Sequence, residues 1–230
     1  MVSARNPLGL EEEVLRSSVF EAAITHRSAG SANYERLEFL GDAVLNMVIA
    51  EHVYIHSPES TEGDLSRLRA ALVNESALAE VAQAADLGQL LRLGQGELKS
   101  GGFRRESILA DALEAIVGAV FLLKGFERAR AFILDLFAER LSRLPRAEEL
   151  KDPKSRLQEL LQARNLPLPT YELCEVTGQP HDQSFTALCT VDHLGVSASG
   201  QGSSRRRAEQ AAALAVLERM MQTADTHAGS

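Results

Sequence analysis

The chain contains no tryptophan, and aromatic residues make up only 5% of its 230 residues. Its two cysteines, Cys174 and Cys189, are too few for a disulfide framework or a four-thiolate zinc site. We therefore expect both to be small core residues of a cytoplasmic protein, where thiols stay reduced. No run of apolar residues is long enough to span a bilayer, since the longest, residues 108–123, contains two acids. We expect no membrane association.

The chain is acidic overall, with a formal net charge of −8. A negative protein is a poor general binder of nucleic acid, but here the charge is unevenly distributed. The acidic surplus lies in residues 1–150, whereas residues 151–230 are almost balanced and include three adjacent arginines at 205–207. Binding of an anionic partner by the C-terminal part is therefore compatible with the composition.

Two regions differ in their hydrophobic pattern. Residues 12–143 repeat apolar side chains every three or four positions, which predicts helices throughout. Residues 153–222 predict a helix, three strands at about 170–177, 184–192 and 195–200, and a final helix that begins near Ser204. We thus expect an all-α domain over residues 1–144, a polar linker over 145–152, a small α-β-β-β-α domain over 153–222 and a disordered tail over 223–230.

The segment "ERLEFLGDAVL", residues 35–45, places three acids on an otherwise apolar helix. Glu35, Glu38 and Asp42 fall within a stripe roughly 60° wide, because each helical residue turns by ~100°. A solvated helix face is the ordinary explanation for such a stripe taken alone.

A second pair of acids is harder to explain as a solvated face. Asp111 and Glu114 are the only charged residues between Glu106 and Lys124, in a helix made of Ile, Leu, Ala, Val and Phe. Burial of an unpaired carboxylate costs several kcal/mol, and no cation within that helix can pair with them. Two acidic helices therefore suggest a shared metal ion. Oxygen ligands without His or Cys favour Mg²⁺ or Mn²⁺.

Magnesium held by a few carboxylates usually meets a phosphate, so the pattern points to phosphoryl chemistry. The chain has no G-x-x-x-x-G-K-[ST] loop for a nucleotide, and we expect no nucleotide cofactor.

The start of the last predicted helix, "SSRRRAEQ", allows two interpretations. Arg205 could pair with Glu209 one turn later, or the arginines could form an anion site with the helix N-terminus. The anion site is the better explanation for three cations at the positive end of a helix dipole. Gln158, Glu159 and His181 are further polar groups that a nucleic-acid groove could use.

Long motifs in both regions resemble a known family. "ERLEFLGDAVL" and "SILADALEAIVGAVFL" resemble the two acidic helices of the ribonuclease III family, and "EGDLSRLRAALVNE" and "GQGELKSGG" resemble the segments between them. "PTYEL", "GQPHDQSF" and "GQGSSRRRAEQAAA" resemble a double-stranded-RNA-binding domain. The resemblance implies an endonuclease that hydrolyses both strands of an RNA duplex to 5′-phosphate and 3′-hydroxyl ends, in the processing of ribosomal and other structured RNA precursors.

The resemblance also implies residue roles. It makes Glu38, Asp111, Glu114 and Asp42 ligands of Mg²⁺, for which Mn²⁺ may substitute. Asp42 and Glu114 match the positions essential for catalysis. Glu35 and Glu62 match further acidic positions of the catalytic valley. In the second domain, the matched RNA-binding positions are Gln158, Glu159, His181, Ser204, Arg205 and Arg206.

Two departures from the family pattern concern residues near these positions. The family usually has lysines at the places of Arg205 and Arg206, and often has asparagine at the place of Tyr34. We expect the arginines to keep the charge but change the contact geometry. We expect Tyr34 to be harmless.

Phe39 lies within the acidic segment, ~40° from Glu35 on the helical wheel. A large apolar side chain there is hard to bury in its own subunit without closing the metal site, although packing in its own core is the alternative. By resemblance, Phe39 inserts into a partner subunit and forms a two-fold homodimer.

Two other function classes are a catalytically silent RNA-binding relative and a structural ribosome-associated protein. A silent relative is expected to lose some of the catalytic acids, but all six acidic positions of the family are present.

Overall fold

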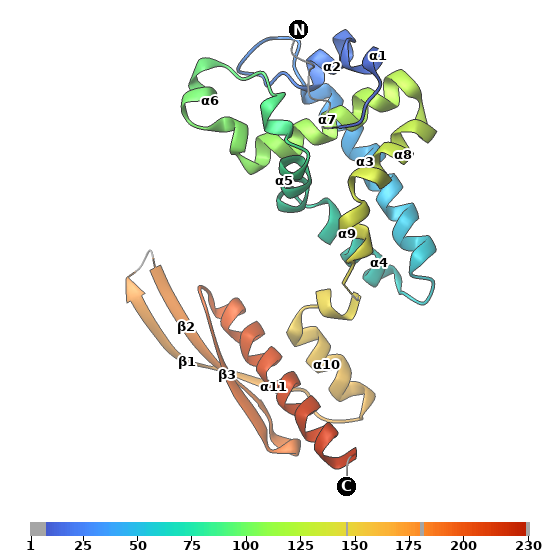
Figure 1. Ribbon diagram of the computed structural model, residues 1–230. Helices are drawn as coiled ribbons and strands as arrows, with labels where there is room; N and C mark the ends of the chain where they lie inside the picture. The colour runs from blue at the N-terminus through green and yellow to red at the C-terminus, as the bar shows by residue number, and fades with distance from the viewer. Residues whose placement is uncertain (1–7, 146, 180–181, 229–230) are drawn as a thin grey trace. The chain divides into compact units, whose positions relative to one another are not determined.

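The computed structural model describes residues 8–145, 147–179 and 182–228, which divide into two compact units, residues 1–150 and 151–230. The first unit is helical (Figure 1). Its α-helices are α1 (Glu12–Leu15), α2 (Ser18–Ala23), α3 (Glu35–His56), α4 (Glu62–Val73), α5 (Glu75–Ala84), α6 (Gln95–Lys99), α7 (Glu106–Lys124), α8 (Phe126–Leu136) and α9 (Ala138–Ser142). Short 3₁₀ helices are η1 (Leu87–Gln89), η2 (Gly102–Arg104) and η3 (Ala147–Leu150).

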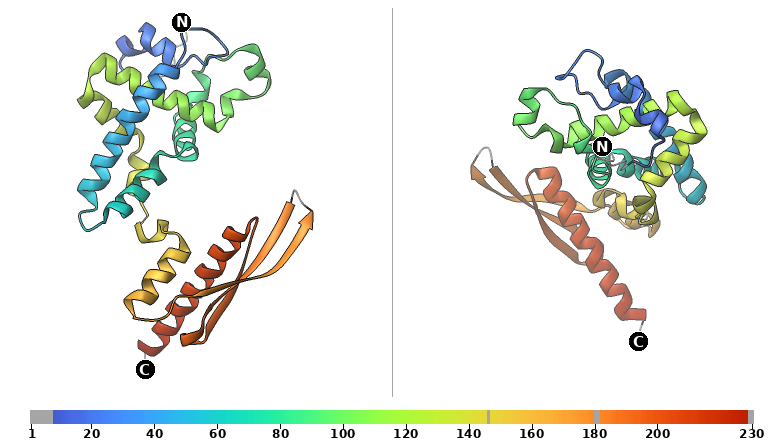
Figure 2. Two further views of the ribbon diagram at one scale, coloured as in Figure 1. Left: turned by 180° about the vertical axis from the view of Figure 1, so that it is seen from behind. Right: turned by 45° about the horizontal axis from the view of Figure 1, so that its top comes forward.

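The second unit has the predicted α-β-β-β-α order. Its elements are α10 (Pro153–Ala163), β1 (Thr170–Gln179), β2 (Asp182–Val191), the 3₁₀ helix η4 (Asp192–Leu194), β3 (Val196–Gly202) and α11 (Arg205–Ala228). The strands form one antiparallel sheet in the order β1-β2-β3, and both helices lie on one face of it (Figures 1 and 2). The predicted fold class, an all-α domain followed by a small α+β domain, is confirmed.

Local sequence explains where several elements begin. Thr61 and Asp64 form a capping box at the start of α4, in which the side chain of each residue bonds the backbone N–H of the other. Asp152 caps α10 by accepting a hydrogen bond from the N–H of Lys154, and proline occupies the first turn. These contacts join residues two or three positions apart, so the local sequence is enough to explain where the two helices start.

The structure corrects the predicted boundaries at three places. α11 continues to Ala228, so the predicted disordered tail at 223–230 is helical over its described residues. The strands β1 and β2 extend to Gln179 and from Asp182, which leaves a shorter hairpin loop than predicted. Part of the predicted linker forms η3, and Leu150 packs against the core of the first unit, because its apolar side chain gains from burial there.

One of the two cysteines also differs from expectation. Cys189 is buried in the core of the second unit, as predicted, but Cys174 is exposed. The register between β1 and β2 shifts between Leu173 and Glu175, so Cys174 lies in a bulge. The bulge does not by itself account for the exposure, because every residue of β1 after Tyr171 is exposed whichever face it lies on. Whether a strand is covered depends on the neighbouring elements, which its local pattern does not show.

The centre of the first unit is the crossing of α3 and α7. Eleven of the 19 residues of α7 are buried, among them both small residues and large aliphatic ones. At the crossing, a Cβ atom on Gly41 would overlap the carbonyl oxygen of Glu114 and lie 2.9 Å from the backbone nitrogen of Gly118. A Cβ atom on Gly118 would in turn overlap the carbonyl oxygen of Leu37. The two helix backbones are in contact because both positions lack a side chain.

Glycines perform a similar role in the second unit. A Cβ atom on Gly200 would overlap the backbone nitrogen of Ala212, and one on Gly202 would lie 2.6 Å from the Cβ of Arg207. The end of β3 therefore lies directly against the first turns of α11. This contact places the start of α11, with its arginines, at one edge of the sheet. Among the described helices of both units, none is long and apolar enough to cross a membrane.

Replacing Gly41 with alanine should lower the stability of the first unit by about 2 kcal/mol or more, because the added methyl group must force α3 away from α7. Thermal unfolding measures the loss. Gly96→Ala is the matched control, since Gly96 is an exposed residue of α6 whose added Cβ would meet nothing within 4 Å. The control should melt at or slightly above the wild-type temperature. Equal melting of Gly41→Ala and wild type would show that the crossing tolerates a side chain.

Candidate active site

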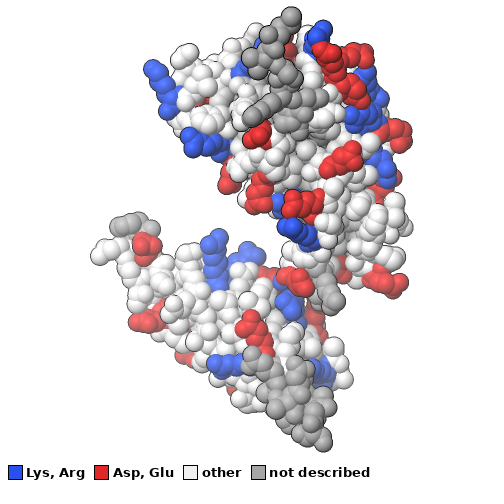
Figure 3. All heavy atoms as spheres, in the orientation of Figure 1, with Lys and Arg blue, Asp and Glu red and all other residues white. Residues whose placement is uncertain are grey.

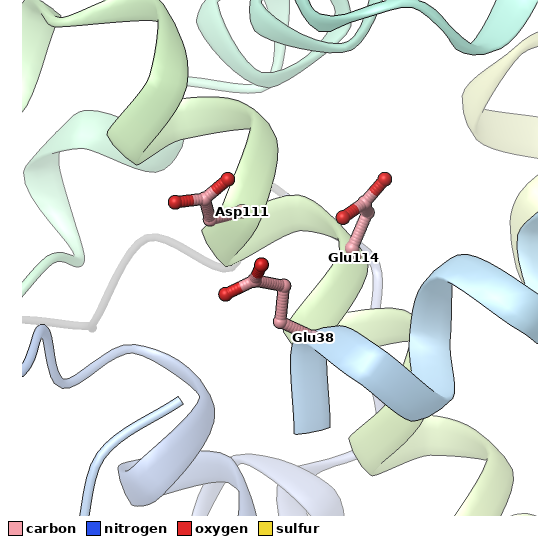
Figure 4. A group of neighbouring side chains, drawn as sticks. All are labelled: Glu38, Asp111 and Glu114. Atoms are coloured by element: carbon pink, nitrogen blue, oxygen red, sulfur yellow. The ribbon is translucent and has the colours of Figure 1, made fainter. Parts of the chain in front are cut away.

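Three carboxylates meet where α3 and α7 cross. Glu38 projects from α3 toward Asp111 and Glu114, which lie on the same side of α7 one turn apart (Figure 4). One carboxylate oxygen of each residue lies within 4.8 Å of the others, and all three side chains are partly buried. The helix spacing of three residues between Asp111 and Glu114 puts both acids on one face, and the glycine crossing brings Glu38 to that face.

The cluster is electrostatically unfavourable when no cation is bound. Burial, first, and then the negative charges of Asp42, Glu38 and Asp111 together raise the pKa of Glu114 to about 8. Burial is also the main cause that raises the pKa of Glu38, with Asp111 next. Every one of these effects on Glu114 opposes its ionised form. A divalent cation shared by the three groups would reverse that balance, because it adds positive charge where the carboxylates repel one another.

Tyr34 orients one member of the cluster. Its hydroxyl donates a hydrogen bond of 3.4 Å to Asp111, and its ring lies edge-on to that of His26 at 5.6 Å between centroids. Both side chains are buried. Burial raises the pKa of Asp111, whereas the bond from Tyr34 favours its ionised form. A buried donor thus compensates part of the cost of placing this carboxylate in the domain.

Asp42 lies one turn beyond Glu38 on α3 but outside the group of three. It is exposed, and its carboxylate accepts a hydrogen bond of 2.6 Å from the side-chain amide of Asn46. It nevertheless raises the pKa of both Glu38 and Glu114, so its charge reaches the cluster. The structure places Asp42, the fourth predicted metal ligand, at the open side of the site and outside the group of three.

The two remaining predicted acids are farther from the cluster centre. Glu35 is exposed in the first turn of α3 and lies 3.7 Å from Arg27, although its charge still acts on Glu38. Glu62 opens α4, where its carboxylate accepts a hydrogen bond from Ser66. Within a single chain, the described residues do not bring Glu62 into the group of three. The sequence could not show this, because the separation of α3 and α4 in space depends on packing.

Phe39 is 82% exposed, the highest value among the large apolar side chains that are exposed in the described residues. The alternative in which Phe39 fills its own core is therefore wrong for this chain. On the same helix, Met47 and Tyr54 are 60% and 71% exposed. At 100° per residue these three side chains fall within roughly 80° of one another, so they form an apolar stripe beside the acidic one.

In the second unit, the predicted basic residues gather at the start of α11. Figure 3 shows Lys and Arg side chains over this end of the helix. Arg205 and Arg206 are exposed, and the hydroxyl oxygen of Ser204 accepts a hydrogen bond from the N–H of Arg207. Arg205 also pairs with Glu209 at 2.8 Å, so the pairing that the sequence allowed is present beside an exposed cationic surface.

Two of the other predicted RNA-binding residues lie on α10. Gln158 and Glu159 are adjacent exposed residues on α10, and Glu159 pairs with Lys151 at 2.6 Å. His181 lies outside the described residues.

The sequence did not reveal two kinds of residue on which the site depends. Gly41 and Gly118 bring the helices together, and their role could have been suspected only from glycines inside strong helical patterns. Tyr34 was expected to be harmless, yet it contacts Asp111. That contact joins residues 77 positions apart, which no local pattern can show.

The comparisons with known proteins agree with this arrangement. Residues 16–141 match the Ribonuclease-III-like family, and residues 153–220 match the double-stranded RNA binding motif. A Ribonuclease 3 from Alkalilimnicola ehrlichii is 54% identical to this chain over 205 residues, which cover 89% of this chain and 90% of the relative.

Solved structures of the nuclease domain of ribonuclease III from Campylobacter jejuni are similar to the first unit. One is 43% identical with a TM-score of 0.52, and covers 56% of this chain and 96% of that one. Another is 42% identical with a TM-score of 0.54, and covers 60% and 96%. The acidic site in a helical domain, followed by an RNA-binding domain, therefore has a clear assignment: the chain belongs to the ribonuclease III family and is an endoribonuclease that acts on double-stranded RNA.

Proposed function

We propose that the chain is a Mg²⁺-dependent endoribonuclease that hydrolyses phosphodiester bonds in both strands of an RNA duplex, leaving 5′-phosphate and 3′-hydroxyl ends. The observation that carries this proposal is the group of three carboxylates, whose oxygens lie within 4.8 Å of one another. Ribosomal and other structured RNA precursors in the cytoplasm are the expected substrates.

The residues present fit a hard divalent cation. Glu38, Asp111 and Glu114 offer only oxygen donors, which suit Mg²⁺ or Mn²⁺ better than zinc. The raised pKa of Glu114 marks a site with uncompensated negative charge, which a bound cation would neutralise. A bound Mg²⁺ would supply Lewis-acid stabilisation of charge on the phosphate oxygens and activation of water.

The residues around the three ligands would define how the phosphate is presented. Tyr34 fixes the carboxylate of Asp111 through its hydroxyl, which keeps one donor oriented. Asp42, which is exposed beside the three ligands, would act on water or on the leaving group. Glu35 and Glu62 would add negative potential along the path of the RNA, with Glu62 acting outside the group of three.

The second unit would hold the duplex. Ser204, Arg205 and Arg206 would bind phosphates, and Gln158, Glu159 and His181 would contact the minor groove. Recognition by such a surface depends on the shape of A-form RNA and on its 2′-hydroxyls, because the deep major groove hides the base edges.

We further propose that the active protein is a homodimer formed through the first unit. The exposed stripe on α3 supports this, since Phe39, Met47 and Tyr54 leave a large apolar surface open in the single chain. A solved relative from Campylobacter jejuni is described as having a flexible region involved in dimer formation. A two-fold contact through α3 would give the dimer two carboxylate clusters, one for each RNA strand.

Glu114→Gln should reduce cleavage by more than roughly 100-fold while leaving duplex affinity nearly unchanged, because the carboxamide keeps the shape but loses the charge that binds the metal. Product formation on a perfect RNA duplex and binding by fluorescence anisotropy measure the two effects. Glu106→Gln is the matched control, since Glu106 is exposed at the N-terminal end of α7, two turns from Glu114. Wild-type cleavage by Glu114→Gln at low Mg²⁺ would contradict the assignment.

The same variant should change the pH dependence of stability. Burial and the neighbouring carboxylates raise the pKa of Glu114 from 4.5 to about 8, so the metal-free wild type should lose stability as the pH rises from about 5 toward 8. Mg²⁺ should restore most of that loss, and Glu114→Gln should show a smaller loss and little response to Mg²⁺. Thermal unfolding with and without the metal measures both.

Arg205→Ala combined with Arg206→Ala should weaken binding to duplexes of any sequence by about tenfold or more, because two charge-assisted phosphate contacts are lost. The slope of log affinity against log salt should fall by roughly one per contact. Arg164→Ala, at an exposed position after α10, is the control for general loss of charge. A loss confined to one RNA sequence would rule out phosphate binding.

Phe39→Asp should give a folded monomer with poor activity, because a side chain that is 82% exposed contributes little to its own domain. Sedimentation at micromolar concentration measures the oligomeric state, and circular dichroism confirms the fold. Leu98→Asp on α6, where Leu98 is 44% exposed, should remain a dimer. A wild-type protein that is monomeric and fully active would refute the dimer.

A further inference from the structure

Glu209 connects two basic side chains of the second unit. It lies in the second turn of α11, and its side chain is only 12% exposed. One carboxylate oxygen accepts a hydrogen bond of 2.8 Å from Nε of Arg205, and the other accepts one of 2.6 Å from Nζ of Lys154 on α10. These two bonds, first that from Lys154, lower the pKa of Glu209. A largely buried carboxylate is thus shared by two cations.

Lys154 is itself fixed by a second contact. Its Nζ lies 4.2 Å from the centre of the Tyr171 ring in β1, within the range of a cation–π interaction. The side chain of Lys154 is 34% exposed. The ammonium group therefore holds Glu209 in place from the side of α10 and β1, and Glu209 in turn holds Arg205.

The hydrogen bond to Glu209 leaves most of the donors of Arg205 available for RNA. A guanidinium group has five N–H donors, and the bond to Glu209 uses the one on Nε. The Arg205 side chain remains 64% exposed, which leaves its two terminal amino groups to meet a phosphate. Because one carboxylate is shared by two cations, the trio keeps a net positive charge.

We propose that Glu209 is a positioning residue for RNA binding, which holds the guanidinium of Arg205 by Nε so that the terminal amino groups are ordered before a phosphate arrives. The inference rests on the proposed role of Arg205 in binding the duplex. The proposal explains why an acidic residue, Glu209, lies beside the arginines. By its charge alone, Glu209 would disfavour the binding of RNA.

Removing Glu209 has two opposing effects on RNA binding. Loss of a negative charge favours the approach of phosphates, but loss of the anchor frees a long side chain that must then be ordered on binding. Ordering such a side chain costs enough to weaken affinity roughly 3- to 10-fold. A largely buried carboxylate that already neutralises Lys154 repels the phosphates little, so the ordering effect should dominate.

The experiment measures affinity of the full chain for a labelled RNA duplex by fluorescence anisotropy, without divalent metal so that the duplex stays intact. Glu209→Gln should raise Kd roughly 3- to 10-fold. Glu218→Gln, an exposed residue of the same helix with the same change of charge, should leave Kd unchanged or slightly lower. Thermal unfolding of each variant verifies that it is folded at the assay temperature.

A double-mutant cycle separates positioning from a general structural role. If Glu209 acts through Arg205, Glu209→Gln should have almost no effect in the Arg205→Ala background. An equal loss in both backgrounds would mean that Glu209 only supports the domain, and unchanged or tighter binding by Glu209→Gln alone would also overturn the inference. If Arg205→Ala itself does not weaken binding, the assignment of Arg205 to RNA fails, and the role of Glu209 fails with it.

Discussion

The approach of α3 to α7 determines where the acidic residues of the first unit lie. Gly41 and Gly118 remove the side chains that would keep the two backbones apart, so the carbonyl of Glu114 lies against Gly41. Glu38 is one turn before Gly41, and Asp111 is one turn before Glu114. The same contact that packs the domain therefore assembles the three carboxylates, and the site cannot be moved without disturbing the core.

The arrangement of the carboxylates that favours binding of a cation lowers the stability of the first unit when no cation is bound. Burial raises the pKa values of Glu38, Asp111 and Glu114, and repulsion by neighbouring carboxylates of the site adds to the effect at Glu38 and Glu114. The ionised cluster therefore destabilises the domain when no cation is bound. The surrounding apolar core of α7 must compensate for that cost. A cation that binds the cluster would then stabilise the fold as well as prepare the chemistry, so metal binding and domain stability should be coupled.

In the second unit, the unfavourable charges are positive, and nearby carboxylates offset them. The first turn of α11 concentrates cations at the positive end of a helix, where they repel one another and the helix dipole. Glu209 and Asp152 place carboxylates behind the arginines, at 2.8 Å from Arg205 and 3.9 Å from Arg206. Packing of β3 against α11 through Gly200 and Gly202 holds this turn at the sheet edge. The arginines are exposed to solvent, and the carboxylates of Glu209 and Asp152 lie beside them and offset part of their repulsion.

Much of this organisation follows from the sequence alone. Hydrophobic period, capping residues and glycine- or proline-rich breaks predicted both domains and the order of their elements, because these signals act over a few residues. The isolated acids in α7 predicted a cation site, since an apolar helix offers them no partner. The predictions of a disordered tail and of a buried Cys174 were wrong, because the length of α11 and the exposure of β1 depend on neighbouring elements rather than on local pattern.

Tertiary structure alone decided which acids meet. Glu38 joins Asp111 and Glu114, whereas Glu35 and Glu62, equally acidic in sequence, remain outside the group. The hydrogen bond from Tyr34 to Asp111 and the sharing of Glu209 by Arg205 and Lys154 join residues that are far apart in the chain or on different elements. The sequence determined which side chains could bind a metal or a phosphate. The close packing of helix and strand backbones at glycine determined where these side chains meet. The sequence alone does not give that information, because the distance between two helices depends on every side chain that separates them.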